Sequence, residues 1–139
     1  MNTRNRFGAG ALVSLALALC TGGAAVAGDI LLPPPDSPSP AASGMAQTRY
    51  NLSSVGDGPG ECGGFFAVTQ FQVSGLLPYT TYAFIVSHGE SGCYYEVVFT
   101  TDRRGKGSGK IKWFGGGPGT ADYAVVDGAD VVVLVGLEE

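Results

Sequence analysis

After about residue 45 the chain alternates between apolar and polar side chains with a period of two, which is the pattern of β-strands with one buried face. Around Phe71 and Val73, for example, the intervening glutamines point to the opposite face. Gly, Asp and Pro separate these runs, as expected for turns. Seven strands are predicted: Gln47–Ser53, Phe65–Ser74, Thr81–Ser87, Cys93–Thr101, Gly109–Phe114, Ala121–Val126 and Val131–Leu137.

The same period of two predicts which side chains form the core. Near the end of the chain, residues 131–135 have no alternation, and such a run is typical of a central strand covered on both faces. The predicted core therefore contains this run and the inward sets Phe71 and Val73; Tyr82, Phe84 and Val86; Tyr95, Val97 and Phe99; and Ile111 and Trp113.

Composition narrows the class of protein. The chain has 139 residues, 23 of them Gly, with 45% hydrophobic and only 14% charged residues. The normal apolar fraction excludes a disordered chain, and the high glycine content argues against a helical bundle. We therefore expect one all-β domain. With 1 His and a net charge of -4, the chain lacks the residues of a multi-histidine metal site and the basic balance of a nucleic-acid-binding protein.

The N-terminal segment has the layout of a secretory signal peptide. Arg4 and Arg6 precede an apolar run that ends at Cys20, and Ala25 and Ala27 supply the small side chains of a cleavage site. We expect a signal peptide over 1–27 and a secreted, periplasmic or extracellular protein without a membrane span, because the apolar run is too short to cross a bilayer.

An alternative is lipid anchoring at Cys20, since Leu17-Ala18-Leu19-Cys20 resembles a bacterial lipoprotein box, although Leu19 stands where that motif has a small residue. Residues 28–45 contain five prolines and predict a disordered, extended tether that ends where the domain 46–139 begins.

Two cysteines remain after the leader, Cys62 and Cys93, and an even pair in an exported chain predicts one disulfide. The alternative, a reactive thiol, lacks both a Cys-x-x-Cys spacing and a basic neighbour.

The stretch from Phe71 to Tyr82 reads Phe-Gln-Val-Ser-Gly-Leu-Leu-Pro-Tyr-Thr-Thr-Tyr and resembles the strand-corner-strand segment of fibronectin type III and related immunoglobulin-like sandwiches. The resemblance covers residues 71–101. It implies that Leu76 or Leu77 plugs the core, and that the Tyr82 hydroxyl returns to the backbone. Too few residues precede Phe71 for the whole fibronectin topology, so we expect an immunoglobulin-like or prealbumin-like sandwich of about seven strands.

Basic residues cluster on one predicted hairpin. After the leader, every Lys and Arg except Arg49 lies between 103 and 112. Asp102 is expected to bond its own turn there, with Gly105 or Gly107 at positive φ. A basic hairpin on an acidic chain either recognises an acidic protein or an anionic glycan, or protects an edge strand from pairing. The candidate binding residues are Arg103, Arg104, Lys106, Lys110, Lys112 and Trp113.

Aromatic side chains are a second candidate for ligand contact. In strands they are more often core residues than stacking platforms. The residues concerned are Tyr50, Tyr79, Tyr94, Trp113 and Tyr123.

Other chemistry has weaker signals. Asp57, Glu61, Asp122, Asp127 and Asp130 lie near glycines, but without the density of a calcium loop, so no metal or cofactor is expected. His88 would have to be the base of any Ser or Cys hydrolase, and no serine lies in a nucleophile elbow.

We therefore expect a non-catalytic binding or cell-envelope interaction module. The alternatives are a structural spacer without a selective ligand or, less favoured, a small secreted enzyme or inhibitor.

Overall fold

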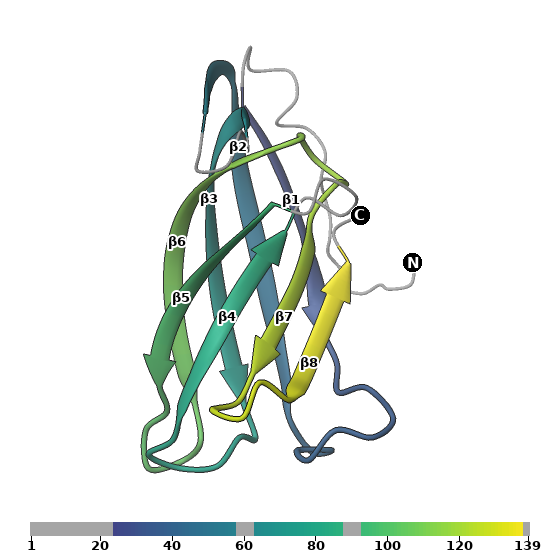
Figure 1. Cartoon of the computed structure of the whole chain (residues 1–139), viewed down its shortest axis with the longest axis vertical. Coiled ribbons are helices and arrows are strands. Elements are labelled where there is room, and N and C mark those ends of the chain that lie inside the picture. Colours follow the sequence, from purple (N-terminus) through teal and green to yellow (C-terminus); the bar gives the residue numbers. More distant parts are fainter. Residues whose placement is uncertain (1–23, 58–62, 88–92, 138–139) are drawn as a thin grey trace.

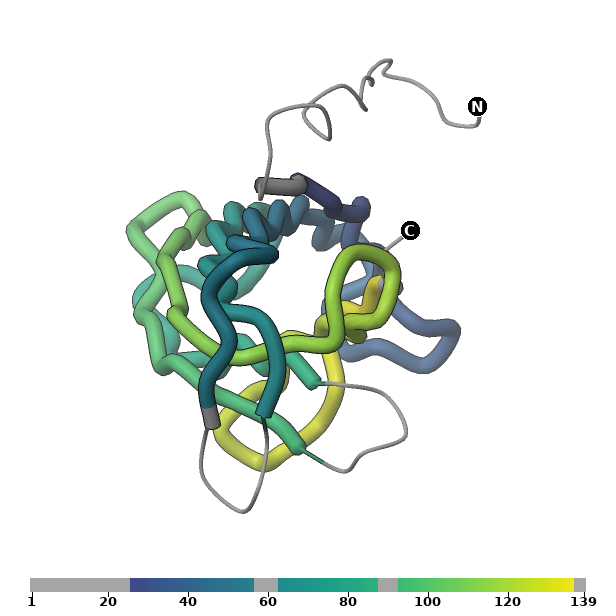
Figure 2. The backbone as a smooth tube through the Cα atoms, turned by 90° about the horizontal axis from the view of Figure 1, so that it is seen from above, coloured from purple at the N-terminus to yellow at the C-terminus, as the bar shows by residue number. Residues whose placement is uncertain are grey.

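The computed structural model describes residues 24–57, 63–87 and 93–137, which form two packed antiparallel sheets (Figure 1). One sheet has the order β1-β2-β3-β6 and the other β5-β4-β7-β8. Figure 2 shows, end on, the two layers around the core. The expected all-β sandwich is confirmed. The strands are β1 (Ala24–Leu31), β2 (Ser43–Asp57), β3 (Gly63–Ser74), β4 (Thr81–Ser87), β5 (Tyr94–Thr100), β6 (Gly107–Gly115), β7 (Asp122–Val126) and β8 (Val132–Leu137).

The seven predicted strands all occur, with shifts at their ends, and β1 is an additional strand that the sequence reading missed. It pairs along its whole length with β2, from Ala24 opposite Asn51 to Leu31 opposite Gly44. The predicted cleavage after Ala27 falls inside this strand, at a residue that is buried and lies opposite Thr48. That cleavage stays a prediction.

Residues 28–45 pack against the sandwich, so the expectation of a disordered tether there is wrong. Leu31 is fully buried, and Leu32 exchanges two backbone hydrogen bonds with Val135 of β8, at 3.0 and 2.9 Å. The Ser37 hydroxyl donates to the Val133 carbonyl at 2.9 Å. The prolines lie in the loop between β1 and β2, where their missing N–H groups leave no ladder bond unmade.

The period of two predicts the buried faces of β3, β4 and β6 correctly. Phe71 of β3 stacks on Phe84 of β4 across the two sheets, with ring centroids 4.1 Å apart. The corner prediction also holds, because Leu76 is the buried leucine and the Leu77 N–H donates to the Tyr82 hydroxyl at 3.2 Å.

β8 corrects the prediction of a central strand over 131–135. It is an edge strand of its sheet, with Val132 and Val135 about two-fifths exposed. The run has no polar alternation because it ends an apolar row on the outer face of this sheet: Val98, Ala83, Val126 and Val132 follow one another across its strands.

A chain of buried polar side chains joins the sheets inside the core. The Trp113 Nε1–H donates to Thr69 Oγ1 at 2.8 Å, and this oxygen lies 2.6 Å from Thr48 Oγ1. Thr48 Oγ1 lies in turn 2.6 Å from the Tyr123 hydroxyl, which belongs to the opposite sheet. All four residues are almost completely buried, so these hydrogen bonds replace the water that the hydroxyls lost on folding.

Replacing Thr48 by Val keeps the side-chain shape but takes the shared hydroxyl out of this chain. We expect Thr48→Val to lower the free energy of unfolding by about 1 to 3 kcal/mol, because buried polar atoms lose a partner. Thr48→Ser keeps the hydroxyl and is the control, with the smaller loss expected. Urea unfolding measures both, and a Thr48→Val variant as stable as the native protein would contradict the structural role.

Candidate binding surface

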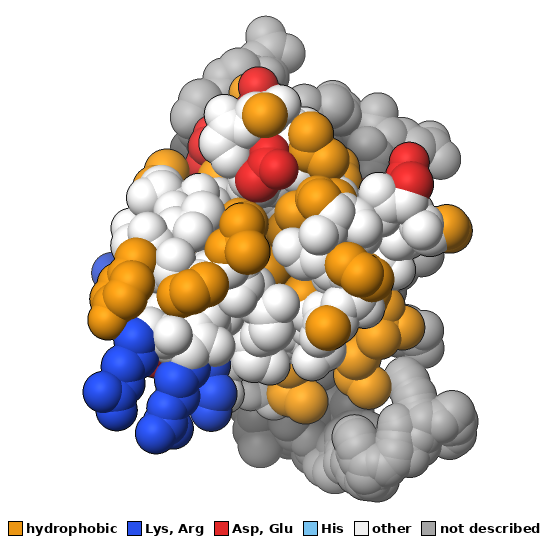
Figure 3. Space-filling view, turned by 90° about the horizontal axis from the view of Figure 1, so that it is seen from below, with side chains coloured by type: hydrophobic (Ala, Val, Ile, Leu, Met, Phe, Trp, Pro, Cys, Tyr) orange, Lys and Arg blue, Asp and Glu red, His pale blue; other side chains and the backbone are white. Residues whose placement is uncertain are grey.

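The predicted basic residues occupy two places. Arg103, Arg104 and Lys106 are exposed in the turn between β5 and β6, at the lower end of the sandwich. Seen from below, Lys and Arg side chains gather at one corner of the molecule (Figure 3). Lys110 and Lys112 lie farther along β6, on the outer face of its sheet. The prediction of a hairpin is wrong, because β5 and β6 pair in different sheets and the turn carries the chain from one sheet to the other. The cations therefore do not form one compact group.

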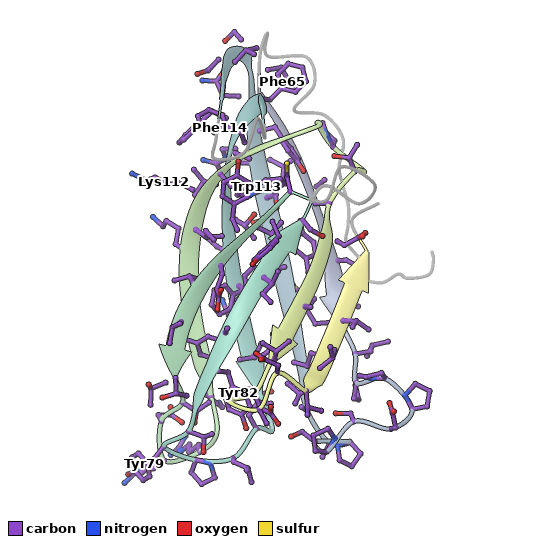
Figure 4. All side chains as sticks on the ribbon, in the orientation of Figure 1. Phe65, Tyr79, Tyr82, Lys112, Trp113 and Phe114 are labelled. Carbon is purple, nitrogen blue, oxygen red and sulfur yellow. The ribbon has the colours of Figure 1, made fainter. Side chains whose placement is uncertain are left out.

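Trp113 does not belong to this surface, so its place among the candidate binding residues is wrong. It is 1% exposed, its ring lies edge-on to Tyr50 at 5.9 Å, and its N–H is bonded within the core. The alternation along β6 explains this, because Lys112 and Phe114 point away from the sandwich while Trp113 points inward (Figure 4).

Backbone hydrogen bonds to Asp102 shape the turn. Its carboxylate accepts the N–H groups of Arg104 at 2.8 Å and Lys106 at 3.0 Å, and its own N–H donates to the Lys106 carbonyl at 2.8 Å. The donated N–H groups of Lys106 and then Arg104 hold the pKa of Asp102 below its ordinary value of 3.8. Gly105 takes φ +75°, so of the two predicted glycines it is the one in the left-handed region.

The loop between β3 and β4, residues 75–80, is hydrogen-bonded to this turn. Leu76 N–H donates to the Gly105 carbonyl and Tyr79 N–H to the Asp102 carbonyl, each at 3.2 Å. The buried Thr101 adds a side-chain link, because its hydroxyl donates to the Leu77 carbonyl at 2.6 Å. The two loops therefore form one firmly connected end. We call four of its exposed side chains the basic tip: Tyr79, Arg103, Arg104 and Lys106.

Tyr79 is the residue of the basic tip that folding explains least. It is 73% exposed and follows Pro78, yet its backbone has φ +53°, in the left-handed region that favours glycine. A bulky side chain there costs free energy, and its exposed ring returns little by burial. Figure 4 shows Tyr79 at the lower extremity of the molecule. Among functional sites such strained positions are common, so Tyr79 is a candidate contact residue.

The other candidate aromatic residues differ clearly in their exposure to solvent. Tyr50 and Tyr123 are buried core residues, whereas Tyr94 is 64% exposed at the start of β5. Tyr94 lies at the opposite end of the strand from the turn that carries Arg103, so it does not join the basic tip.

The remaining candidates give no assembled site within the described ranges. No group of three His, Cys, Asp or Glu residues there is placed to hold a metal ion. One Asp127 carboxylate oxygen accepts the N–H groups of Ala129 and Val131, at 2.8 and 3.0 Å, which is turn chemistry. Cys20, Glu61, Cys62 and His88 lie outside the described residues.

Comparison with known proteins found no matching family model, no matching curated protein and no matching solved structure. In the part of the chain that the structure describes, no helix has the length and hydropathy of a membrane span.

The pKa of Asp102 makes the turn sensitive to acid. Because the folded-state pKa is depressed, its stabilising effect is present above the ordinary value of 3.8 and is lost as the pH falls through the folded-state pKa. A carboxyl NMR titration should place the midpoint of Asp102 below 3.8, with the amide signals of Arg104 and Lys106 moving along the same curve. A midpoint at or above that value would contradict the hydrogen bonding.

Alanine substitutions at three glycines distinguish the cost of a strained φ from the cost of a steric clash. At Gly105 a Cβ would lie 2.0 Å from the Leu76 carbonyl oxygen and the φ is positive; at Gly119 the φ is +88° but the space is open; at Gly128 neither limit applies. Alanine should therefore cost more than about 2 kcal/mol at Gly105, about 1 kcal/mol at Gly119 and less than about 0.5 kcal/mol at Gly128. Chemical denaturation of the three variants tests this order.

Proposed function

We propose that the protein is an exported, non-catalytic binding module whose basic tip recognises an acidic partner, either an anionic glycan or an acidic protein. The observation that carries the proposal is the exposed Tyr79 in a left-handed conformation beside Arg103, Arg104 and Lys106. Stability alone would favour glycine at position 79. A tyrosine there gives a partner an aromatic ring next to three positive charges, and Tyr and Arg are the residues that most often dominate recognition.

The structural spacer without a ligand is the rival function. A spacer needs the two sheets and their connections, but it has no use for an exposed aromatic residue at a strained position. Charged residues near an edge strand would still serve to prevent aggregation. The basic residues are therefore compatible with both functions, whereas the exposed, strained Tyr79 is explained only by binding.

We further infer an immunoglobulin-like or prealbumin-like domain, closed by a disulfide between Cys62 and Cys93. Support for the pair comes from the positions of the two cysteines along the chain. Cys62 immediately precedes β3 and Cys93 immediately precedes β5, and both strands begin at the upper end of the sandwich (Figure 1). Closing the loop of about 31 residues would stabilise the fold by about 3 to 4 kcal/mol. Intact-mass analysis before and after reduction tests the pair.

Affinity capture from the producing organism's medium and solubilised envelope tests the binding proposal. The bait is the purified exported protein, beside a variant that carries Arg103→Glu, Arg104→Glu and Lys106→Glu. We expect the reversed variant to lose a salt-sensitive partner while its melting temperature changes by less than about 2 °C, because all three side chains are exposed. A partner that both baits retain equally would contradict the proposal.

Tyr79→Gly separates binding from stability. Removing the strained side chain should raise the free energy of unfolding by about 1 kcal/mol and weaken capture at least about fivefold. Tyr94→Thr is the matched control, because it removes the other exposed tyrosine far from the basic tip and should leave capture unchanged. If Tyr79→Gly is more stable and binds as well as the native protein, the spacer function is favoured.

A further inference from the structure

The outer face of the β1-β2-β3-β6 sheet carries a second group of cations that the hairpin pattern did not reveal. In the strand register Arg49 of β2 lies opposite Val68 of β3, which lies opposite Lys112 of β6. One row farther down, Gln47, Gln70 and Lys110 follow one another in the same order. Arg49, isolated in the sequence, therefore joins the lysines of β6 on one surface.

From Met45 to Asn51 of β2, and along the stretches of β3 and β6 that follow it in register, this face has no acidic side chain to balance its charge. The outward positions alternate along β2 from Met45 to Asn51, along β3 from Phe66 to Gln72 and along β6 from Ser108 to Phe114, and none of them is Asp or Glu. Neither Arg49 nor Lys110 forms an ion pair with any residue in the described ranges. On a chain with 12 acidic and 8 basic residues, such a face concentrates positive potential in one place.

A depression of about 200 Å³ lies in the middle of this face. Two valines, two glutamines and two cations line it: Val26, Gln47, Arg49, Val68, Gln70 and Lys110. The valines offer an apolar surface, the glutamines offer amide donors and acceptors, and the cations stand on β2 and β6 with β3 between them. The depression thus combines three kinds of contact within reach of one small ring.

We propose that this depression binds one acidic sugar unit of an anionic polysaccharide. The acid group is held by Arg49 and Lys110, the hydroxyl groups exchange hydrogen bonds with Gln47 and Gln70, and the C–H face of the ring rests on Val68. The inference rests on the proposed function, because the polymer in the depression is the acidic ligand of the basic tip.

β6 connects the two contact regions. Lys106 precedes this strand, and Ser108 and Lys110 follow on the same outward face at every second position. At about 3.3 Å per residue, Lys106 and Lys110 are about 13 Å apart along the strand. A polysaccharide of a few units can therefore contact both regions. A folded acidic protein would need a broader patch, since stable protein interfaces bury about 800 Å² on each partner.

The test is an amide NMR titration of the exported protein, which keeps five of the six lining residues when the predicted cleavage after Ala27 removes Val26. Three probes are used: tetragalacturonate, a sulfated dextran oligomer and a neutral dextran oligomer. We expect both acidic probes to shift the amides of Gln47, Arg49 and Gln70, and the neutral probe to shift none. The two acidic probes distinguish a carboxylate from a sulfate ligand. Arg49→Gln and Lys110→Gln should each weaken the affinity for the acidic probes about fivefold to tenfold.

Lys112→Gln is the matched control, because it removes the same charge from the same face of β6 but outside the depression. It should change the affinity less than about twofold. Equal losses from Lys110→Gln and Lys112→Gln would reduce the effect to general charge attraction and overturn the site. Polyglutamate, a fourth probe, carries carboxylates without sugar rings, and equally tight binding of it would overturn the choice of a sugar.

Failure of this inference and failure of the proposed function give different results. If the reversed basic tip loses its captured partner while Arg49→Gln and Lys110→Gln keep theirs, the depression is not a binding site and the basic tip stands. If the native protein captures a partner but binds no acidic oligosaccharide, the ligand class is wrong and the binding module stands. If the native protein captures no partner and binds no acidic oligosaccharide, both proposals are wrong.

Discussion

A buried hydrogen bond between Thr48 and Tyr123 ties the two sheets together inside the core. Apolar burial is non-directional, whereas a buried hydroxyl keeps its partner only in one relative position of the strands. Thr69 and Trp113 extend this constraint through β3 and β6. The same alternation that turns Trp113 inward turns Lys112 outward, so the core contact also fixes what the outer face presents.

The basic tip depends on backbone hydrogen bonds instead of side-chain packing. The Asp102 carbonyl accepts the Tyr79 N–H, and the Gly105 carbonyl accepts the Leu76 N–H. These bonds hold both loops at the end of a continuous core. Such rigidity allows an unfavourable backbone conformation to persist at Tyr79, since the surrounding loops leave it little alternative. Substitutions at the exposed side chains of the basic tip should therefore leave the sandwich undisturbed.

Local patterns predicted much of this fold. Period-two alternation located seven strands, and the Asp102 turn and the Tyr82 corner were both read from a few residues. The sequence did not predict β1 because its first residues, Ala24 to Ala27, are small and were assigned to the cleavage site of the signal peptide. Small residues also suit a strand that packs closely on its neighbour.

Trp113 had conflicting assignments, and the period that grouped it with Ile111 in the core was the correct guide. The φ of Tyr79 and the meeting of Arg49 with Lys110 were beyond the sequence, because they depend on contacts between distant segments.

The contacts between the first and last strands bear on how the chain folds. The Ser37 hydroxyl meets the Val133 carbonyl 96 positions away, and the Leu32–Val135 bridge closes the same side of the sandwich. Contacts of this separation form only after most of the chain has been ordered, which places the protein among domains that fold in milliseconds to seconds. We expect the contacts of Leu32 and Ser37 with β8 to form late and to open early, so transient exposure to proteases and to other chains should begin at this seam.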